Sequence, residues 1–277
     1  MGTCYKLYQT AKDDELKVIG IPKTIDNDIT ETDHCPGYGS AARYMAVTTS
    51  EIAQDIASMP IHICIIEAMG RNAGWIAASS ILARKKPEDA PHLVYIPEKP
   101  FIIDQFLQDA ATLYKQIGGV VVVVSEGITD QNGKPVVPPL IVPGAKDPYP
   151  GDIGVYLARQ IWEKLGIKAR GEKPGIAARA SATLQSPIDR NEAIQVGAAA
   201  VKAAVVGETG YMIGLERLSN NPYKCDTTLI PLDKVSDIEK KLPEFYINER
   251  GNDINPEFID YCKPLVGELP EYAVLER

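Results

Sequence analysis

The sequence holds little from which a metal centre, a disulfide framework or a membrane span could be built. Its five cysteines are scattered, none of them in a C-x-x-C pair, and it has three histidines. Structural zinc sites and small disulfide-linked domains depend on such paired spacings, so neither is indicated. The longest apolar run, Val120 to Val124, is far too short to span a bilayer. We therefore expect a protein of the reducing cytoplasm.

A basic surface is also lacking. Lysine and arginine total 29 against 37 aspartate and glutamate residues, which gives a formal net charge of -8. This balance disfavours binding to nucleic acid or to an anionic membrane through bulk charge. The 277 residues are 45% hydrophobic and 24% charged, as in ordinary globular proteins, and suffice for one large domain or two smaller ones. An anionic substrate would therefore need a few well-placed cations to hold it.

Short β-branched runs alternate along the chain with longer segments whose apolar residues recur at helical spacing. The clearest run, Val120 to Val124, is apolar throughout, which is typical of strands buried on both faces of a parallel sheet. This alternation predicts a doubly wound α/β protein. We expect strands at residues 17–21, 61–68, 93–96, 120–124, 167–170 and 210–215, and helices at 39–58, 75–86, 102–116, 152–165 and 188–206.

Polar residues follow three of the expected strands directly. The first strand is followed by Lys23, Asp26 and Asp28, the second by Met69–Arg71, and the run of valines by Glu126. In open α/β sheets, ligands bind beyond the carboxyl ends of the strands. If these three strand ends meet in one crevice, they form a site for a phosphorylated, hydroxyl-rich ligand.

Each residue type suits a part of phosphoryl-transfer chemistry. Either Asp26 or Asp28 can accept a hydroxyl proton or help to hold Mg²⁺, which prefers hard oxygen ligands. Lys23 would supply a positive charge to the phosphoryl group, and Arg71 can grip phosphate with two parallel hydrogen bonds. Glu126 could accept hydrogen bonds from sugar hydroxyls.

Structural explanations exist for the same residues. An Asp-Asn-Asp sequence after a strand is often a turn and helix cap, which would account for Asp26 and Asp28. Arg71 could be a solvated residue near a helix start, and Glu126 a turn residue. The agreement of three strand ends favours the functional interpretation.

At these residues the chain resembles the phosphofructokinase family. The stretch GIPKTIDNDI is similar to that family's catalytic signature and DHCPGYGSAARY to its continuation; EAMGRNAGW resembles its sugar-phosphate motif and VVVVSEG its later glutamate strand. The similarity extends to DYCKPLVGELP near the end of the chain. The resemblance implies two α/β lobes with a sugar phosphate between them, and Mg²⁺-dependent phosphoryl transfer to the 1-hydroxyl of fructose 6-phosphate.

The resemblance also implies roles for individual residues. Lys23 favours pyrophosphate over ATP as donor, because the family's bacterial ATP users commonly have glycine there. Two positions depart from the family pattern: His62 replaces an arginine that often reaches the neighbouring subunit's ligand, and Ile176 replaces a histidine. The implied catalytic residues are Asp26 as the base, Lys23 and Thr24, with Asp28 near the metal; the implied sugar-phosphate contacts are Met69, Gly70, Arg71, Glu126, Arg170 and Arg179, the last two nine positions apart.

The same resemblance suggests how the chain is divided. Residues 1–37 and 180–235 would be the remnant of a phosphoryl-donor lobe, 38–179 the sugar-phosphate lobe and 236–277 a C-terminal extension. The family's glycine-rich donor loop is not found in this sequence, so we expect a fragment that cannot transfer phosphate alone, and a homo-oligomer (dimer or tetramer). The alternatives are a non-catalytic sugar-phosphate-binding subunit and a related kinase for another sugar phosphate.

Overall fold

The computed structural model describes residues 1–11, 15–59, 62–141, 143–144, 149, 151–236 and 238–272. Residue 61, the expected start of the second strand, lies outside them. The strands are β1 (Ile19–Gly20), β2 (Ile63–Ala68), β3 (Leu93–Tyr95), β4 (Val120–Ser125), β5 (Ala169–Glu172), β6 (Tyr211–Asn220) and β7 (Tyr223–Pro231). The helices are α1 (Gly2–Thr10), α2 (Tyr38–Ser58), α3 (Trp75–Ser79), α4 (Ile103–Ile117), α5 (Ile153–Leu165), α6 (Ala177–Ala180), α7 (Pro187–Val205), α8 (Leu232–Val235) and α9 (Glu257–Val266), with 3₁₀ helices η1 (Ser80–Ala83) and η2 (Glu244–Tyr246).

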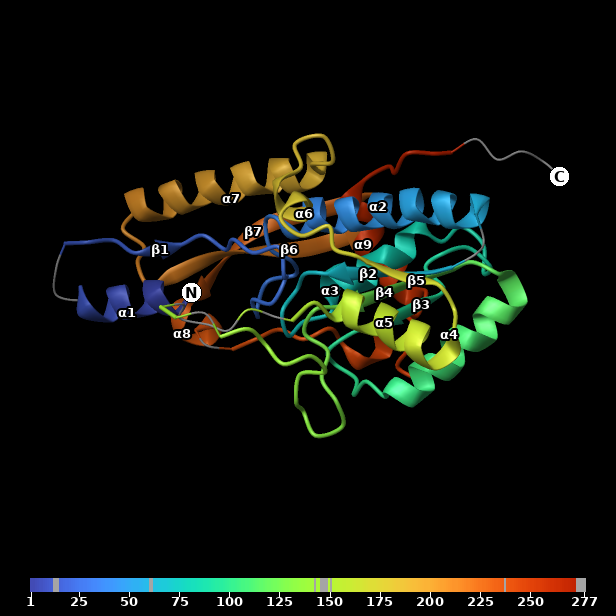
Figure 1. The fold of residues 1–277 in the computed structure, drawn as a ribbon. Coiled ribbons are helices and arrows are strands. Elements are labelled where there is room, and N and C mark those ends of the chain that lie inside the picture. Colours follow the sequence, from blue (N-terminus) through green and yellow to red (C-terminus); the bar gives the residue numbers. More distant parts are fainter. Residues whose placement is uncertain are drawn as a thin grey trace.

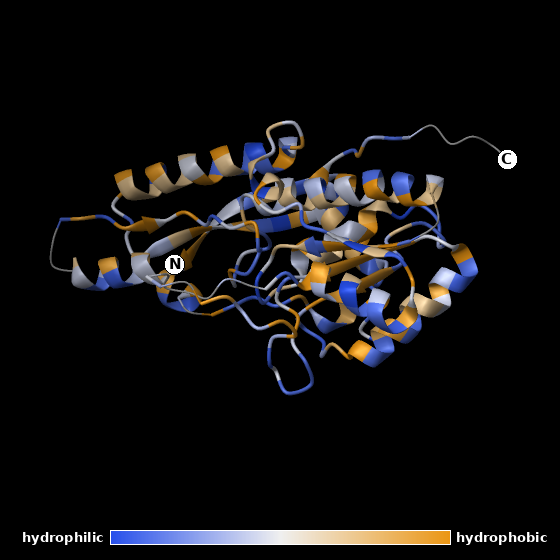
Figure 2. Cartoon of the chain, in the orientation of Figure 1, coloured by the Kyte–Doolittle hydropathy of each residue, from blue (hydrophilic) through white to orange (hydrophobic). Residues whose placement is uncertain are grey.

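A four-stranded parallel sheet forms the centre of one lobe. Its strand order is β3-β4-β2-β5, and all pairings are parallel. Alternate residues of β4 point to opposite faces: Val121 and Val123 pack in the cluster with α2, α3 and α9, whereas Val122 packs in the cluster with α4 and α5. Figure 1 shows these helices on either side of the sheet, and Figure 2 shows its strands as predominantly hydrophobic. The predicted doubly wound α/β arrangement is confirmed for this lobe.

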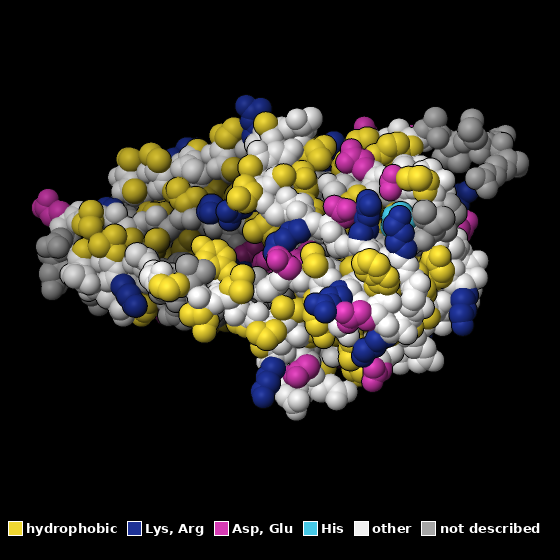
Figure 3. Space-filling model, in the orientation of Figure 1, with side chains coloured by type: hydrophobic (Ala, Val, Ile, Leu, Met, Phe, Trp, Pro, Cys, Tyr) yellow, Lys and Arg dark blue, Asp and Glu magenta, His cyan; other side chains and the backbone are white. Residues whose placement is uncertain are grey.

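A second sheet has three strands in the order β1-β6-β7. Strand β1 pairs in parallel with β6, but β6 and β7 form an antiparallel hairpin. The predicted strand ends at residue 215 and β7 is not predicted, because the polar residues of the hairpin and its Asn221-Pro222 turn resemble a loop. Helix α7 covers one face of the sheet and α1 the other. Figure 3 shows apolar side chains exposed on the surface of this lobe. The exposed apolar residues include Leu7, Val205 and Val206.

The helix expected at 75–86 is shorter and tightens midway. It is α-helical only to Ser79, then forms η1 and ends at Ala83. The hydroxyls of Ser79 and Ser80 donate hydrogen bonds to the carbonyls three residues earlier, at 2.6 Å each. Such bonds from serine to the preceding turn compete with regular helix geometry, and hydrophobic spacing does not reveal them.

The last part of the chain returns to the four-stranded lobe. This part contains helix α9, whose residues Phe258, Cys262 and Leu265 are buried beside Tyr38 and Trp75. Trp75 also packs against the Phe258 ring, 6.3 Å between centroids. Residues 238–272 thus contribute to the core of this lobe as well as to its surface. In the described part of the chain, no helix has the length and apolar character that crossing a membrane requires.

Candidate active site

The candidate site lies where the connections of two neighbouring strands diverge. After β2 the chain turns to α3 on one face of the sheet, and after β4 it continues to α5 on the other face. Such a divergence opens a crevice at the carboxyl ends of the strands. The ends are in register, because Ala68 pairs with Ser125 and the Glu126 N–H donates to the Ala68 carbonyl at 2.9 Å.

Glu126 organises the loop that follows β2. Its Oε1 accepts hydrogen bonds from the backbone N–H groups of Gly70 and Arg71, each at 3.2 Å. Both residues have positive φ, 136° and 50°, so the loop makes a sharp turn here. The Arg71 side chain is 72% exposed and free to reach a ligand. In this structure Glu126 therefore positions Arg71, in addition to any contact it makes with a sugar.

The backbones of the two loops touch at Gly127. A Cβ atom at this position would lie 1.6 Å from the Arg71 carbonyl oxygen, so only glycine fits. Met69 is partly buried and packs against the hydrophobic core of the four-stranded lobe. The distance between the β2 and β4 loops is thus fixed by direct backbone contact.

The loop after β1 approaches the same crevice from the other sheet. The Asp26 carboxylate lies 3.8 Å from Arg71 Nε, with Asp26 largely buried. The Thr24 hydroxyl oxygen accepts the Asp26 N–H at 3.0 Å, and Thr24 forms a parallel bridge with Gly37. The structure therefore brings together Asp26, Arg71 and Glu126, which the strand-end argument expected to meet.

Asp26 has the electrostatic environment of a base that works near neutral pH. Burial raises its pKa to about 6, and the carboxylates of Asp28 and Glu126 act in the same direction. Arg71, and to a lesser extent Lys23, lower the pKa of Asp26. A general base is most effective when its pKa lies close to the working pH.

The raised pKa of Asp26 predicts a pH-dependent gain in stability for Asp26→Asn. The folded-state pKa, about 6, exceeds the ordinary value of 3.8, so ionisation of Asp26 destabilises the fold as pH rises between these values. We expect the variant to exceed the wild type in unfolding free energy by about 2–3 kcal/mol at pH 8, and by close to zero at pH 4. Urea unfolding at both pH values measures the difference, and an equal gain at both would contradict the pKa.

Asp28 has the properties of a metal ligand. Its carboxylate makes no hydrogen bond or ion pair within the described residues, whereas its backbone carbonyl accepts the Lys240 N–H. A carboxylate of this kind, two residues from Asp26, could hold Mg²⁺, which commonly takes one or two carboxylates and completes its shell with water and substrate phosphate. Lys23 is exposed on the same loop.

Arg170 and Arg179, the two other arginines expected to contact the sugar phosphate, lie away from the crevice. Arg170 pairs in register with Cys64, four residues before the end of β2, which places it about 13 Å down the sheet from the crevice. It is half exposed and lies 3.8 Å from Glu172. Arg179 is exposed on the short helix α6. Within this chain, neither joins the Asp26 cluster.

Several residues of the site are absent from the sequence-based prediction. Glu98 follows β3, and its Oε1 accepts the N–H of Gly74, which begins α3; the strand-end rule could have found it. Tyr261 and Lys240 contact the Asp26 loop from more than 200 residues away. Neither a tyrosine on helix α9 nor one lysine of a Lys-Lys pair has a sequence pattern that would mark it as part of a site.

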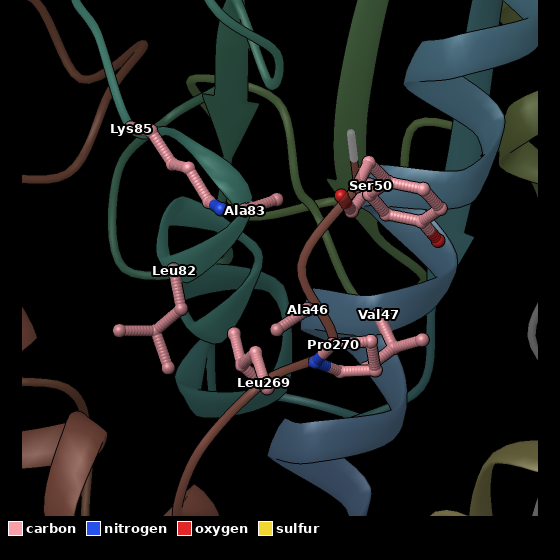
Figure 4. A pocket seen from close by; sticks show the side chains of 9 residues that line it. Ala46, Val47, Ser50, Leu82, Ala83, Lys85, Leu269 and Pro270 are labelled. Carbon is pink, nitrogen blue, oxygen red and sulfur yellow. The ribbon is translucent and has the colours of Figure 1, made fainter. Parts of the chain in front are cut away.

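Two other features carry no active-site chemistry. His34 and Glu192 lie with Cys225 in a cluster whose ligand atoms are within 4.8 Å of one another. Both ring nitrogens of His34 are already bonded, to Asp33 and Glu192 at 2.7 Å each, so the group is a hydrogen-bonded ion-pair network. Figure 4 shows a pocket between α2, η1 and the C-terminal residues, lined by Ala46, Val47, Ser50, Leu82, Ala83, Lys85, Leu269, Pro270 and Tyr272. At about 20 Å³ it holds a water molecule, not a sugar phosphate.

Comparison with known proteins identifies the family. The phosphofructokinase family model matches residues 1–204. The pyrophosphate–fructose 6-phosphate 1-phosphotransferase of Xanthomonas campestris pv. campestris is 40% identical over 97% of this chain and 66% of its own length. The sulfofructose kinase of Alkalicoccus urumqiensis is 37% identical over 85% of this chain and 61% of its own length.

Solved structures agree with these relatives. The crystal structure of a pyrophosphate-dependent phosphofructokinase from Marinobacter aquaeolei superposes with a TM-score of 0.86 at 33% identity, covering 98% of this chain and 67% of that one. The corresponding protein from Nitrosospira multiformis gives 0.85 at 34% identity, covering 98% and 66%. This chain spans about two thirds of the length of the proteins it matches. The family match, the identities and the shared fold together show that the chain belongs to the phosphofructokinase family.

Proposed function

We propose that the site transfers a phosphoryl group from pyrophosphate to the 1-hydroxyl of fructose 6-phosphate, giving fructose 1,6-bisphosphate. The observation that carries this proposal is the meeting of Asp26 with Arg71 and the Glu126-held loop in one crevice. A buried carboxylate with a pKa near 6 can accept the hydroxyl proton, and the exposed guanidinium can hold a phosphate. The names of the relatives support the substrate, and Lys23 supports the donor.

In the proposed reaction, the sugar oxygen forms a bond to phosphorus while the bond from phosphorus to the leaving phosphate breaks. The hydroxyl proton passes to Asp26. Lys23 and the Thr24 hydroxyl lie on the same loop and would face the group in transfer. Mg²⁺ bound at Asp28 would neutralise charge on the phosphates. Pre-positioned charges of this kind supply most of the catalysis of phosphoryl transfer.

The positions of Arg170 and Arg179 support a homo-oligomer. Both are exposed and lie away from Asp26 in this chain. We infer that they bind the sugar phosphate held by a neighbouring subunit, in a dimer or tetramer. The five cysteines are all free in the structure, in keeping with the reducing cytoplasm that we propose as its compartment.

A second candidate is a kinase for a different sugar carrying an anionic group. The similarity to a sulfofructose kinase favours it, and His62 and Ile176 stand where the family has basic residues. A third candidate is a subunit that binds sugar phosphate without transferring a phosphoryl group. Two measurements separate them. Calorimetry that shows tighter binding of a 6-sulfonate sugar than of fructose 6-phosphate favours the second candidate. Binding without turnover, even when the family's donor loop is joined to the chain, favours the third.

The proposal is tested with the purified protein, fructose 6-phosphate, Mg²⁺ and either pyrophosphate or ATP, with product detected by mass. We expect the chain by itself to bind fructose 6-phosphate without turnover, and fructose 1,6-bisphosphate to form from pyrophosphate once the family's glycine-rich donor loop is joined to it. All kcat values expected for variants refer to that joined form. Product formed from ATP alone would reverse the assignment of the donor. Absence of fructose 6-phosphate binding by calorimetry would contradict the proposal as a whole.

Arg71→Ala should weaken fructose 6-phosphate binding by about 10–100-fold, because a hydrogen bond to a charged group contributes about 1.5–3 kcal/mol. It should also raise the pKa of Asp26, since Arg71 lowers it in the wild type. Calorimetry measures the affinity. Arg159→Ala is the matched control, because Arg159 is exposed on α5 and pairs only with Glu163 one turn away within the described residues. Equal affinity in both variants would exclude Arg71 as a phosphate ligand.

A further inference from the structure

Residues Glu239 to Leu242, here called the 239–242 segment, run alongside the loop that carries Asp26. Glu239 forms an antiparallel bridge with Ile29. The N–H of Lys240 donates to the carbonyl of Asp28 at 2.7 Å. The segment is thus paired with the backbone just beyond the proposed catalytic base.

The other end of the 239–242 segment contacts the loop that carries Arg71. The N–H of Leu242 donates to Glu98 Oε1 at 2.9 Å, and the same oxygen accepts the N–H of Gly74 at 2.9 Å. The ammonium of Lys241 donates to the carbonyl of Asn72. One short stretch of chain therefore joins the two loops whose side chains meet in the crevice.

The side chain of Lys240 turns inward rather than to solvent. Its Nζ donates to the carbonyls of Thr32 at 2.9 Å and Asp33 at 2.6 Å, and lies 4.9 Å from the centre of the Trp75 ring. The Trp75 ring nitrogen donates to the Lys240 carbonyl at 3.2 Å. A compact ammonium with three donors can satisfy two carbonyls and face an aromatic ring at once. Lys240 therefore ties the Asp26 loop to the start of α3.

The Asp26 loop is held on its other side by Tyr261. The Tyr261 hydroxyl donates to the carbonyl of Asp33 at 2.9 Å and accepts the side-chain amide of Asn27 at 3.0 Å. Asn27 is fully buried, with φ of 56°, an uncommon conformation for a residue with a side chain. The carbonyl of Asp33 thus receives hydrogen bonds from both Lys240 and Tyr261, and the residue after Asp26 has little freedom to move.

We propose that Lys240 is a positioning residue for phosphoryl transfer, which keeps Asp26 opposite Arg71 by holding the backbone at Asp28, Thr32 and Asp33. The proposal deepens the proposed function and rests on it, because Asp26 matters to catalysis only if it is the base. Lys240 itself would not touch the substrate. A displacement of about 1 Å in such a group is enough to lower turnover by about 10²-fold.

The hold on the Asp26 loop can be followed by hydrogen exchange. Lys240→Met removes the ammonium that bonds to the carbonyls of Thr32 and Asp33. In the variant, the N–H groups of Asp26 and Cys35, both bonded within this loop at 3.0 Å, should exchange at least about tenfold faster than in the wild type, because a loop held by fewer hydrogen bonds opens more often. NMR measures the exchange of both groups.

Lys234→Met is the matched control, since it removes the same charge from an exposed position on α8 and should leave the exchange of these N–H groups unchanged. Unaltered exchange of both groups in folded Lys240→Met would overturn the proposal. If Lys240→Met does not fold, Lys240→Gln takes its place. The glutamine side chain is one bond shorter than that of lysine, so its amide cannot reach both carbonyls. The same measurement and the same two outcomes then apply.

Turnover adds a second measurement. In Lys240→Met, kcat should fall by about 10–100-fold while the KM for fructose 6-phosphate stays within about threefold. A raised KM with unchanged kcat would overturn the assignment, because it would place Lys240 in substrate binding. If the wild type binds no fructose 6-phosphate, the proposed function fails, but hydrogen exchange still decides whether Lys240 positions the loop.

Discussion

Asp26→Asn should lower kcat for phosphoryl transfer by about 10²–10⁴-fold, the usual contribution of a general base, and leave fructose 6-phosphate binding within about threefold. Asparagine has the shape of aspartate but cannot accept the proton from the attacking hydroxyl. Arg71 and the loop held by Glu126 remain in place, so the groups that bind the phosphate are retained. The loss should therefore fall on the chemical step alone.

The pH profile distinguishes this role from a structural one. In the wild type, kcat should decline below the pKa of Asp26, about 6, because the protonated acid cannot act as a base. The acid limb should be absent from the residual activity of Asp26→Asn. Asp130→Asn is the control, since the Asp130 carboxylate lies in an exposed turn after β4 and accepts hydrogen bonds from Asn132 and Lys134 within that same turn. Near-normal turnover in Asp26→Asn would show that another group accepts the proton.

The positions of Arg71 and Glu126 were predictable because β2 and β4 are neighbours in one parallel sheet and end at a common edge. The same rule selected Asp26, but β1 lies in the other sheet, so the meeting of Asp26 with Arg71 depends on how the two sheets pack. The rule gives no angle between the two sheets. The approach of the β1 loop to the β2 loop depends on packing between lobes, which no local pattern encodes. The ordered motifs along the chain gave the resemblance to the phosphofructokinase family. The match to a solved structure of that family confirmed the fold that the resemblance implies.

The location of Arg170 illustrates what spacing does not reveal. Nine residues separate it from Arg179, but register decides how far along the sheet each one lies. Strand β5 pairs Arg170 with Cys64, so the side chain is several residues away from the carboxyl edge. Their role as phosphate ligands stays a prediction that depends on a second subunit.

The hydrogen bonds that hold the Asp26 loop in place could not be predicted for a different reason. Lys240 and Tyr261 act through hydrogen bonds to the carbonyl groups of Thr32 and Asp33, more than 200 residues earlier in the chain. The sequence around Lys240 has the composition of a solvated loop. A buried lysine becomes recognisable only when the carbonyls it satisfies are in place, and those carbonyls are presented by the irregular loop at Thr32 and Asp33.

Gly127→Ala should disrupt the site without removing any functional group. The new Cβ would lie 1.6 Å from the Arg71 carbonyl oxygen and 2.5 Å from its carbonyl carbon, so the two loops must separate. Overpacking of this kind commonly costs about 1–3 kcal/mol of stability. The separation also pulls Glu126 away from the N–H groups of Gly70 and Arg71, which lie at 3.2 Å. We expect fructose 6-phosphate affinity to fall by about 10–100-fold, as in Arg71→Ala, because the shift moves Arg71 away from the phosphate it is proposed to bind.

Gly197→Ala is the control for this substitution. Gly197 lies within α7, and among the described residues no atom outside its own helix turn lies within 4 Å of the position that an alanine methyl group would take. Alanine in a helix interior should raise the unfolding free energy by about 0.5–1 kcal/mol. The same chemical change is thus expected to act in opposite directions at the two glycines. Thermal unfolding and calorimetry with fructose 6-phosphate measure both effects. If Gly127→Ala unfolds and binds as the wild type does, the two loops are not in contact, and the geometry assigned to Arg71 and Glu126 is wrong.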